Sequence, residues 1–560
     1  MENANAEGMA EPPVHSQAAA VLEIERRQND FVPIGRLPDE VLEPVFIYVR
    51  DSDTDELVKG KLIKYHFLYA PKWTFVTWVC RRFRAVCLGH PLLWSQIRNY
   101  TPKWLFAFLE RSMACALDVR IDTILHKPAS LKCILQSTPR MRALVLEGFA
   151  HANFEHVLSA MKVLTRELTT LSLLQAGGPL AAVGGPTVEA MVHIDNSLLC
   201  NVNQLRRLDL RGRISHIHPS SSLLSPSLEH LRLEGAYTAA ELTILLREAP
   251  SLQSLVLRGT KVYAPPGARE TPESITTIPL LRLSSLDIKI HFREEVPRLL
   301  HILNLPTLRH VSVTLASFHF GNPITTLSAL SSLLQQCNNG APFQSLRLQP
   351  IKKYSDGRCV GQHIALWHSP HTGAKSKFSH PPLSPPQADI GFQPRSPYVD
   401  PLDAHTLVSF YKNLCTCLPL ASVSTLTIDI NRNLPRSAWK DILRPLSRVE
   451  HLKLLGKWPV LILEALAITP FTLPALSHVA ISRPMHAPGT SPPLLLELMG
   501  VAKARAGERR IHIAFIDCVG FASKRYESLR EFADVTWDHM SFFDDGAEDE
   551  DEPWLALISG

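Results

Sequence analysis

The sequence of 560 residues predicts a mixed α/β protein in which a small N-terminal helical domain is followed by a long series of strand–helix repeats. Two amphipathic segments between residues 34 and 97 indicate the helical domain. A six-residue apolar pattern that returns many times after residue 141 indicates the repeats. Hydrophobic residues make up 45% of the chain and charged residues 20%, as in globular proteins, and a chain of this length can bury a sizeable core.

Residues 1–30 are predicted to be partly disordered, with one short helix, and the helical domain is predicted at residues 31–100. Its first helix is expected to begin at Pro38, because a proline in the first turn loses no hydrogen bond. Asp39 and Glu40 then place negative charge at the positive end of the helix. Apolar residues recur behind them at helical spacing and are expected to form one face, which consists of Val41, Leu42, Val45, Phe46 and Val49.

Three motifs follow one another in this domain. They are Leu-Pro-Asp-Glu at 37–40, Val-Cys-Arg-Arg-Phe-Arg at 79–84 and Pro-Leu-Leu-Trp at 91–94. Their types and order resemble the F-box, most closely that of the F-box proteins expanded in mushroom-forming fungi. The resemblance implies docking onto a Skp-type adaptor and, through it, a cullin. It assigns adaptor docking, or the fold that supports it, to Leu37, Pro38, Leu42, Phe46, Val79, Cys80, Phe83, Leu93 and Trp94.

The domain departs from the F-box pattern at several points. Phe83 stands where the family usually has tryptophan, which removes an indole N–H. Pro44 falls inside the first helix and is expected to kink it. An insertion of roughly residues 51–71, which opens with an acidic run, separates the two helices. An alternative interpretation is that the apolar faces are simply the core of an ordinary helical subdomain without a partner.

The repeats are predicted from the pattern apolar-x-x-apolar-x-apolar, as in residues 205–210, 228–233 and 252–257. Its alternation describes a short strand with one buried face. Most intervals lie between 23 and 37 residues, which overlaps and exceeds the ~20–29-residue period of leucine-rich repeats, the family that the pattern resembles. Because one such unit cannot bury its own leucines, the units are expected to stack. The resemblance implies an irregular solenoid over residues 101–543, with parallel strands on its concave side. The central strand residues fall at 144, 171, 208, 231, 255, 286, 311, 346, 426, 452 and 479.

Several segments outside this pattern have predictions of their own. Residues 360–367 read as a strand of a degenerate repeat, and about 368–400, rich in proline and serine, as a loop insertion. Returning helices are expected near 239–248 and 494–505. Residues 544–560 are expected to form a disordered acidic tail, because seven acidic residues and no basic residue fall between 544 and 552.

Residues that flank the central strand position point away from the core and are candidates for binding a protein substrate on the concave face. An alternative is that these positions are polar only because they contact water. The candidate substrate-binding residues are Arg207, Asp209, His230, Arg232, Asp287, His310, Arg347, His451 and Lys453.

Other functional classes find little support in the sequence. It contains no phosphate-binding loop, nucleophile elbow or zinc-protease motif, so we expect no enzyme, no catalytic residues and no cofactor. The histidines of the 368–400 insertion and Cys415 with Cys417 lack the spacing of metal ligands, so no metal site is expected. Basic residues are scattered, which argues against a nucleic-acid partner. No run of ~20 apolar residues and no signal peptide is found, which favours a cytoplasmic or nuclear protein with no membrane partner.

The sequence therefore predicts a substrate-recognition subunit of a cullin–RING ubiquitin ligase, in which the F-box docks a Skp-type adaptor and the repeats bind an unknown protein target. The alternative is a leucine-rich-repeat interaction scaffold without a role in ubiquitination.

Overall fold

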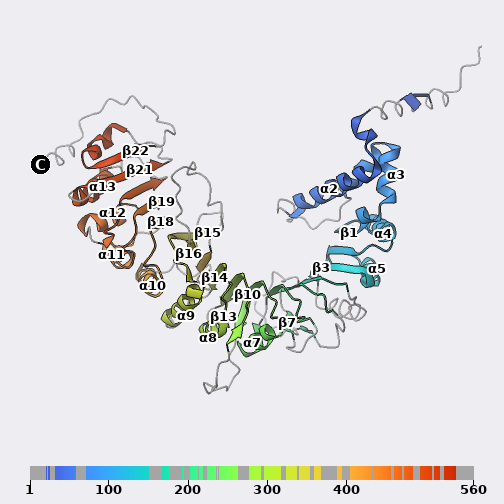
Figure 1. Cartoon of the computed structure of the whole chain (residues 1–560), viewed down its shortest axis with the longest axis horizontal. Helices are drawn as coiled ribbons and strands as arrows, with labels where there is room; N and C mark the ends of the chain where they lie inside the picture. The colour runs from blue at the N-terminus through green and yellow to red at the C-terminus, as the bar shows by residue number, and fades with distance from the viewer. Residues whose placement is uncertain are drawn as a thin grey trace, which may run out of the picture. The chain divides into compact units, whose positions relative to one another are not determined.

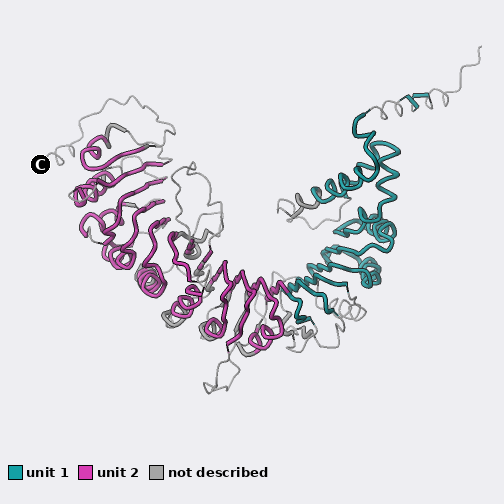
Figure 2. The backbone as a smooth tube through the Cα atoms, in the orientation of Figure 1, with its two compact units in different colours: residues 1–228 teal, residues 229–560 magenta. Residues whose placement is uncertain are grey.

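The computed structural model divides the chain into two compact units, residues 1–228 and 229–560 (Figure 2). The boundary predicted near residue 101, between the helical domain and the repeats, falls inside the first unit and stays a prediction. The residues that the structure describes are 20–21, 23–24, 32–58, 71–149, 167–175, 192–194, 202–211, 214–217, 223–234, 236–237, 239–262, 277–291, 295–316, 323–336, 340–352, 359–367, 387–393, 404–429, 434–455, 459–469, 472–482, 492–506, 510–516 and 523–537.

In the first unit, residues 33–94 contain the group of helices that we call the helical module. Its elements are η1 (Pro33–Arg36), α2 (Asp39–Val58), η2 (Lys72–Trp78), α3 (Arg81–Gly89) and η3 (Pro91–Trp94) (Figure 1). One prediction needs correction, because the acidic run assigned to an insertion continues α2 as far as Val58. The second helix begins at Arg81. Cys80 precedes it as the N-cap, and its Sγ accepts the backbone N–H of Phe83 at 3.4 Å.

After the module in the sequence, parallel strands alternate with helices in the first unit. Each strand pairs in parallel with the next one named, in the order β1 (Gln96–Ile97), β2 (Leu117–Asp122), β3 (Met141–Phe149), β4 (Thr170–Gln175) and β6 (Arg207–Arg211). The helices between them are α4 (Pro102–Arg111), α5 (Pro128–Gln136) and the short η4 (Thr138–Arg140). A separate parallel pair joins β5 (Val192–Ile194) to β7 (Ile214–Ile217).

The second unit repeats this arrangement over a longer stretch. One parallel series runs β8 (His230–Leu233), β10 (Ser254–Val262), β12 (Ser285–His291) and β14 (His310–Ala316). Another runs β15 (Ser345–Lys352), β18 (Thr425–Asp429), β19 (His451–Leu455), β20 (His478–Ser482), β21 (Ile511–Ile516) and β22 (Ala533–Trp537). Short parallel pairs join β9 (Ala236–Tyr237) to β10, and β11 (Ile278–Pro279) to β13 (Leu303–Asn304).

Helices connect these strands and pack on one another in chain order. They are α7 (Ala239–Arg247), α8 (Glu295–Ile302), α9 (Pro323–Gln336), α10 (Ala404–Cys417), α11 (Arg436–Leu443), α12 (Pro459–Ile468) and α13 (Pro492–Arg505), with η8 (Ser523–Glu531) before the last strand. α7 and α13 confirm the helices expected near 239–248 and 494–505. The chain is thus a mixed α/β protein whose strands pair mainly in parallel, as the sequence predicts at this level.

A two-stranded insertion joins the two strand series of the second unit. β16 (Cys359–Trp367) pairs antiparallel with both β15 and β17 (Ala388–Gln393), and β17 pairs in parallel with β14. The strand expected at 360–367 therefore exists, but its antiparallel direction excludes a degenerate repeat with a parallel strand. The loop predicted for about 368–400 also needs correction, because residues 388–393 form β17; residues 368–386 lie outside the described part of the chain.

The central strand residues predicted from the pattern all lie in the core. Leu144, Leu171, Leu208, Leu286 and Leu426 are fully buried, and the remaining central residues are at most 1% exposed. In contrast, the residues on either side of them are mostly half-buried or exposed. The predicted assignment of strand faces is thereby confirmed. The predicted acidic tail and most of the N-terminal segment lie outside the described residues.

This burial predicts the effect of truncating one repeat strand. Leu208→Ala is expected to lower the free energy of unfolding by ~2–5 kcal/mol, because it leaves a cavity in a packed core. Arg207→Ala, at the exposed neighbouring position, should cost less than about 0.5 kcal/mol. Urea titration of both variants checks this, and equal losses would contradict the assigned faces.

Candidate interaction surfaces

The helical module has a small apolar core of its own. Leu42 and Phe46 on α2 are 0% and 3% exposed, and Phe83 on α3 is 6% exposed. The rings of Phe46 and Phe83 meet edge to face with centroids 5.1 Å apart, a favourable geometry for aromatic pairs. Phe83, expected as a possible interface anchor, therefore joins α3 to α2 inside the module.

An aromatic cluster continues this core into α4. Trp94 is fully buried, and its ring lies edge to face with Trp73 on η2 and Phe108 on α4, at centroid distances of 5.2 and 4.9 Å. Its indole Nε1 donates a hydrogen bond to the Cys87 carbonyl at 2.8 Å, and the Arg111 guanidinium lies 4.5 Å from its ring centre. The module and the first helix of the strand–helix region therefore share one core.

Arg82 fixes the turn that leads into α2. Its guanidinium donates hydrogen bonds to the backbone carbonyls of Gly35 and Leu37. It also bonds to the Asp39 carboxylate, at 2.6 Å from Nη2 and 3.1 Å from Nε. One side chain of α3 thus holds the Leu37–Pro38 segment and the first residue of α2 together.

This geometry predicts unequal roles for two adjacent arginines of α3. Arg82→Ala should destabilise the first unit by about 1–2 kcal/mol, because it removes several charge-assisted hydrogen bonds at a partly exposed site. Arg81→Ala is the matched control and should cost less than about 0.5 kcal/mol, since the Arg81 side chain is exposed and makes no hydrogen bond among the described residues. Denaturant melts of both variants test the difference; similar losses would show that the clamp contributes nothing.

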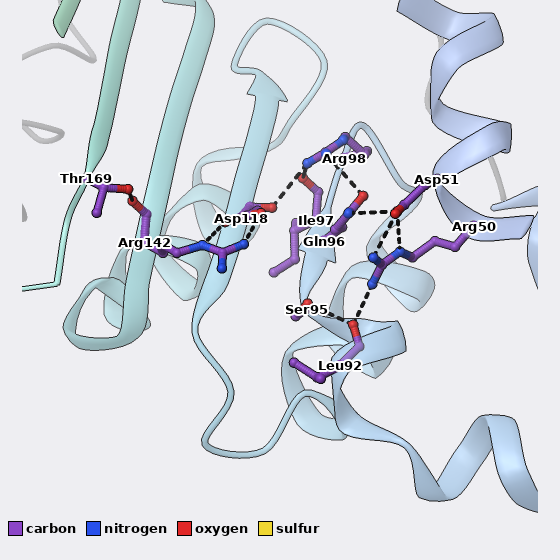
Figure 3. A network of polar contacts seen from close by, with 10 residues as sticks. All are labelled: Arg50, Asp51, Leu92, Ser95, Gln96, Ile97, Arg98, Asp118, Arg142 and Thr169. Atoms are coloured by element: carbon purple, nitrogen blue, oxygen red, sulfur yellow. Dashed lines mark hydrogen bonds and ion pairs between the residues drawn. The ribbon is translucent and has the colours of Figure 1, made fainter. Parts of the chain in front are cut away.

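A chain of polar contacts extends from α2 across the first strands (Figure 3). The buried Arg50 guanidinium pairs with Asp51 at 2.8 Å and donates to the Leu92 carbonyl, and Asp51 accepts a bond from Gln96 on β1 at 3.0 Å. Arg98 then connects Gln96 to the backbone of Asp118 on β2, at 3.2 and 3.1 Å.

The same network reaches the next two strands. The Asp118 carboxylate pairs with Arg142 on β3 at 2.7 Å, and this bond raises the pKa of the Arg142 guanidinium (Figure 3). Thr169, next to β4, donates its hydroxyl to the Arg142 carbonyl at 3.1 Å. α2 is therefore tied by polar contacts, as well as by the aromatic core, to the strands of the first unit.

Besides Ile34, Leu92 and the adjoining Val32, two groups of neighbouring apolar side chains in the module are exposed. The first, which we call the α2 stripe, consists of Val41, Val45 and Tyr48, at helical spacing i, i+4 and i+7, with exposures of 43%, 37% and 74%. The second, the η2 patch, consists of Phe75, Trp78 and Val79, with exposures of 55%, 75% and 57%.

Exposed apolar residues are rarer elsewhere in the described chain. In the second unit they are only Ile244, Leu281, Ile468 and Leu496, which lie far apart in the sequence. Grouped apolar exposure of this kind marks interaction surfaces more often than scattered single residues do. The helical module is therefore the best candidate for a protein-docking surface.

The residues assigned to adaptor docking divide into two classes in the structure. Leu42, Phe46, Phe83, Leu93 and Trp94 are buried in the module core and can only support its fold. Pro38 and Val79 are exposed, whereas Leu37 and Cys80 are half-buried. The sequence-based assignment did not include the exposed residues Val41, Val45, Tyr48, Phe75 and Trp78 as contact candidates, although it placed Val41 and Val45 on the apolar face.

A second candidate surface follows the strands of the second unit. The residues on either side of each buried central position align in two register rows. Row 1 contains His230, Ser254, Ser285 and His310 on β8–β14, and Ser345, Thr425, His451, His478, His512 and Asp534 on β15–β22. Row 2 contains Arg232, Val256, Asp287 and Ser312, then Arg347, Thr427, Lys453, Ala480, Ala514 and Thr536.

The structure thus brings seven of the predicted substrate-binding residues into these rows: His230, His310 and His451 in row 1, and Arg232, Asp287, Arg347 and Lys453 in row 2. Arg207 and Asp209 occupy the equivalent positions of β6, in the first unit. The rows are not evenly exposed, because Ser345 and Thr425 are 2% and 8% exposed near the insertion. A polar residue at an outward strand position is therefore not always exposed to solvent.

Several of these side chains are already engaged within the chain. Asp209 pairs with Arg211 of the same strand, and Asp287 with Arg258 on β10, each at 2.5 Å. Burial lowers the pKa of Arg347, an effect that Asp429, 3.9 Å away, opposes. Such intramolecular pairs reduce what these residues can offer a partner. The sequence pattern places His478 at the same outward position as His451, although His478 is not among the candidates named above. It missed β21 with His512, because Ile511–Ile516 alternates without the leading leucines of the pattern.

The described residues contain no group of three or more histidine, cysteine or acidic side chains arranged to hold a metal ion. Within the same residues, no helix combines the length and the apolarity needed to cross a membrane. Comparison of the sequence with protein-family models gives no match, and comparison with curated proteins gives no relative.

Proposed function

We propose that the chain is a substrate receptor of a cullin–RING ubiquitin ligase. Its helical module acts as an F-box that docks a Skp-type adaptor, and its strand–helix repeats, an irregular leucine-rich-repeat solenoid, hold a protein target. The mechanism is positioning: a target held close to the ubiquitin-loaded enzyme reacts as if at high local concentration. No residue of this chain takes part in the chemistry.

The observation that carries the adaptor proposal is the divided face of α2. One side of the helix, with Leu42 and Phe46, is buried in the module, while the adjacent side presents Val41, Val45 and Tyr48 to solvent. A helical subdomain without a partner gains nothing from an exposed apolar surface on α2. The exposed side therefore favours a docking partner over the alternative of a subdomain core alone. The three sequence motifs that resemble the F-box lie on and around this helix and α3.

The regular strand–helix alternation supports the solenoid part of the proposal. Neighbouring strands pair in parallel, neighbouring helices pack in sequence order, and the leucines at the central positions form a continuous core. Stacked units of this kind present many strand positions at once, which suits an extended protein ligand.

Affinity capture of the full-length chain from cells tests this function. The expected result is co-purification of a Skp-type adaptor and a cullin, which is lost when Val41 and Val45 are both replaced by glutamate. Capture of other proteins without adaptor or cullin would instead favour the interaction scaffold that has no role in ubiquitination.

A further inference from the structure

Three histidines stand side by side on consecutive strands of the second unit. His451 on β19, His478 on β20 and His512 on β21 occupy one register row, and we call them the histidine ladder. Ring centroids are 4.4 Å apart between His451 and His478 and 5.3 Å apart between His478 and His512. His478 is exposed and the other two are half-buried, so solvent reaches the ladder.

Hydroxyl groups hold two of the rings in place. The Ser477 Oγ lies 2.8 Å from Nδ1 of His478, and the Thr536 Oγ1 lies 3.2 Å from Nε2 of His512. The opposite ring nitrogens, Nε2 of His478 and Nδ1 of His512, make no hydrogen bond among the described residues. When protonated, each of these nitrogens can donate to an anionic oxygen.

The strands around the ladder set its charge. Lys453 on β19 lies in the neighbouring row, and Glu450 precedes the same strand. Towards β22, Arg510 and Asp534 pair at 3.9 Å. On the β18 side, Thr425 and Thr427 are neutral, and Asp429 lies 3.9 Å from Arg347. Protonation of the ladder would therefore give a local excess of positive charge.

Space beside the ladder suits a peptide chain. Row 2 continues from Lys453 to Ala480 and Ala514, so two of the three positions next to the imidazoles carry only a methyl group. A bound segment could therefore approach the ring nitrogens without meeting a bulky side chain at those two positions.

The imidazoles also oppose one another's protonation. Partial burial lowers the pKa of His478, with further lowering from the charges of His451 and His512, while Glu450 acts in the opposite sense. An anion placed over the ladder would relieve this repulsion, so its binding must be coupled to proton uptake. Affinity for that anion must then rise as the pH falls.

We propose that the histidine ladder binds a carboxylate-rich segment of the target protein, with an affinity that increases on acidification. Charge complementarity selects this occupant, because a row of imidazolium groups flanked by Lys453 matches repeated Asp or Glu side chains. The inference rests on the proposed role of the second unit in holding a target and is independent of adaptor docking.

An oligoglutamate peptide titrated into the full-length protein tests the proposal. Its affinity is expected to rise at least about tenfold between about pH 7.5 and about pH 5.5, which bracket the ordinary histidine pKa of ~6.5. A variant with His451→Gln, His478→Gln and His512→Gln should lose this rise. A matched control with His301→Gln, at an exposed position on α8, should keep it, and an oligoglutamine peptide should not bind at either pH.

Histidine titration by NMR gives a second readout. Bound peptide should raise the pKa of His478, whereas a peptide that binds elsewhere would leave it unchanged. Because the pKa of His478 is lowered in the folded state, the unfolded chain takes up this proton first as the pH falls below ~6.5. The wild type should therefore lose more stability on acidification than the triple variant does, and this holds without any ligand.

Three outcomes would overturn the proposal. They are an undiminished pH response in the triple variant, an unchanged His478 pKa with peptide bound, and peptide binding only after the acids of residues 544–552 are changed to their amides. The last result would identify the chain's own tail as the occupant. Adaptor capture by the triple variant at constant pH should stay normal, which separates failure of this inference from failure of the adaptor proposal.

Discussion

Simultaneous replacement of Val41 and Val45 by glutamate is expected to weaken adaptor binding at least about hundredfold. Both side chains lie in the exposed α2 stripe. Loss of an anchoring residue at an interface commonly costs ~2 kcal/mol or more, and ~1.4 kcal/mol is a factor of ten. Two buried carboxylates without partners would add a desolvation cost. Titration calorimetry with a purified Skp-type adaptor measures the effect.

The fold of the variant should be unaffected, because neither side chain belongs to the module core. Ile244→Glu provides a matched control: Ile244 on α7 is 43% exposed, as Val41 is, but lies in the second unit. It should bind the adaptor like the wild type. Normal binding by the double variant would exclude α2 from the interface and leave the scaffold function as the better explanation.

Helix periodicity predicted an apolar face on α2 but could not divide it. Val41, Leu42, Val45 and Phe46 have the same apolar character in the sequence, yet only Leu42 and Phe46 contact the module core. The positions of η2 and α3 determine which side of this apolar face becomes buried. The spacing of apolar residues within α2 does not predict those positions. The same limit placed Phe83 among the contact residues, although it packs against Phe46.

Strand faces were easier to predict than strand order. Alternation has a period of two, so one buried leucine such as Leu452 fixes the direction of His451 and Lys453 on either side. The insertion of β16 and β17 between β14 and β15 depends on pairing between distant segments, for which the repeat pattern gives no signal. The sequence pattern puts His451 and His478 in one column, but the approach of His512 to His478 appears only once strand neighbours are known.

Two tryptophans of the helical module should respond in opposite ways to the same substitution. Trp94→Ala is expected to destabilise the first unit by ~3–5 kcal/mol, because the side chain is fully buried among Trp73 and Phe108 and its indole donates to the Cys87 carbonyl. Trp78→Ala, at a position 75% exposed, should cost less than about 0.5 kcal/mol of stability. It should nevertheless weaken adaptor binding at least about tenfold if the η2 patch takes part in docking.

Amide hydrogen exchange, measured separately for the two units, distinguishes the effects of these two substitutions from a loss of stability throughout the chain. In Trp94→Ala, faster exchange is expected in α2, α3, α4 and β2, since the aromatic core and the polar network that runs from α2 through Gln96 and Arg98 to β2 join these elements. Exchange in the second unit should stay at the wild-type rate. In Trp78→Ala, exchange should stay unchanged throughout. Equal losses of folding stability and of adaptor affinity in the two variants would contradict this division of the module. Each tryptophan would then contribute both to the core and to adaptor binding.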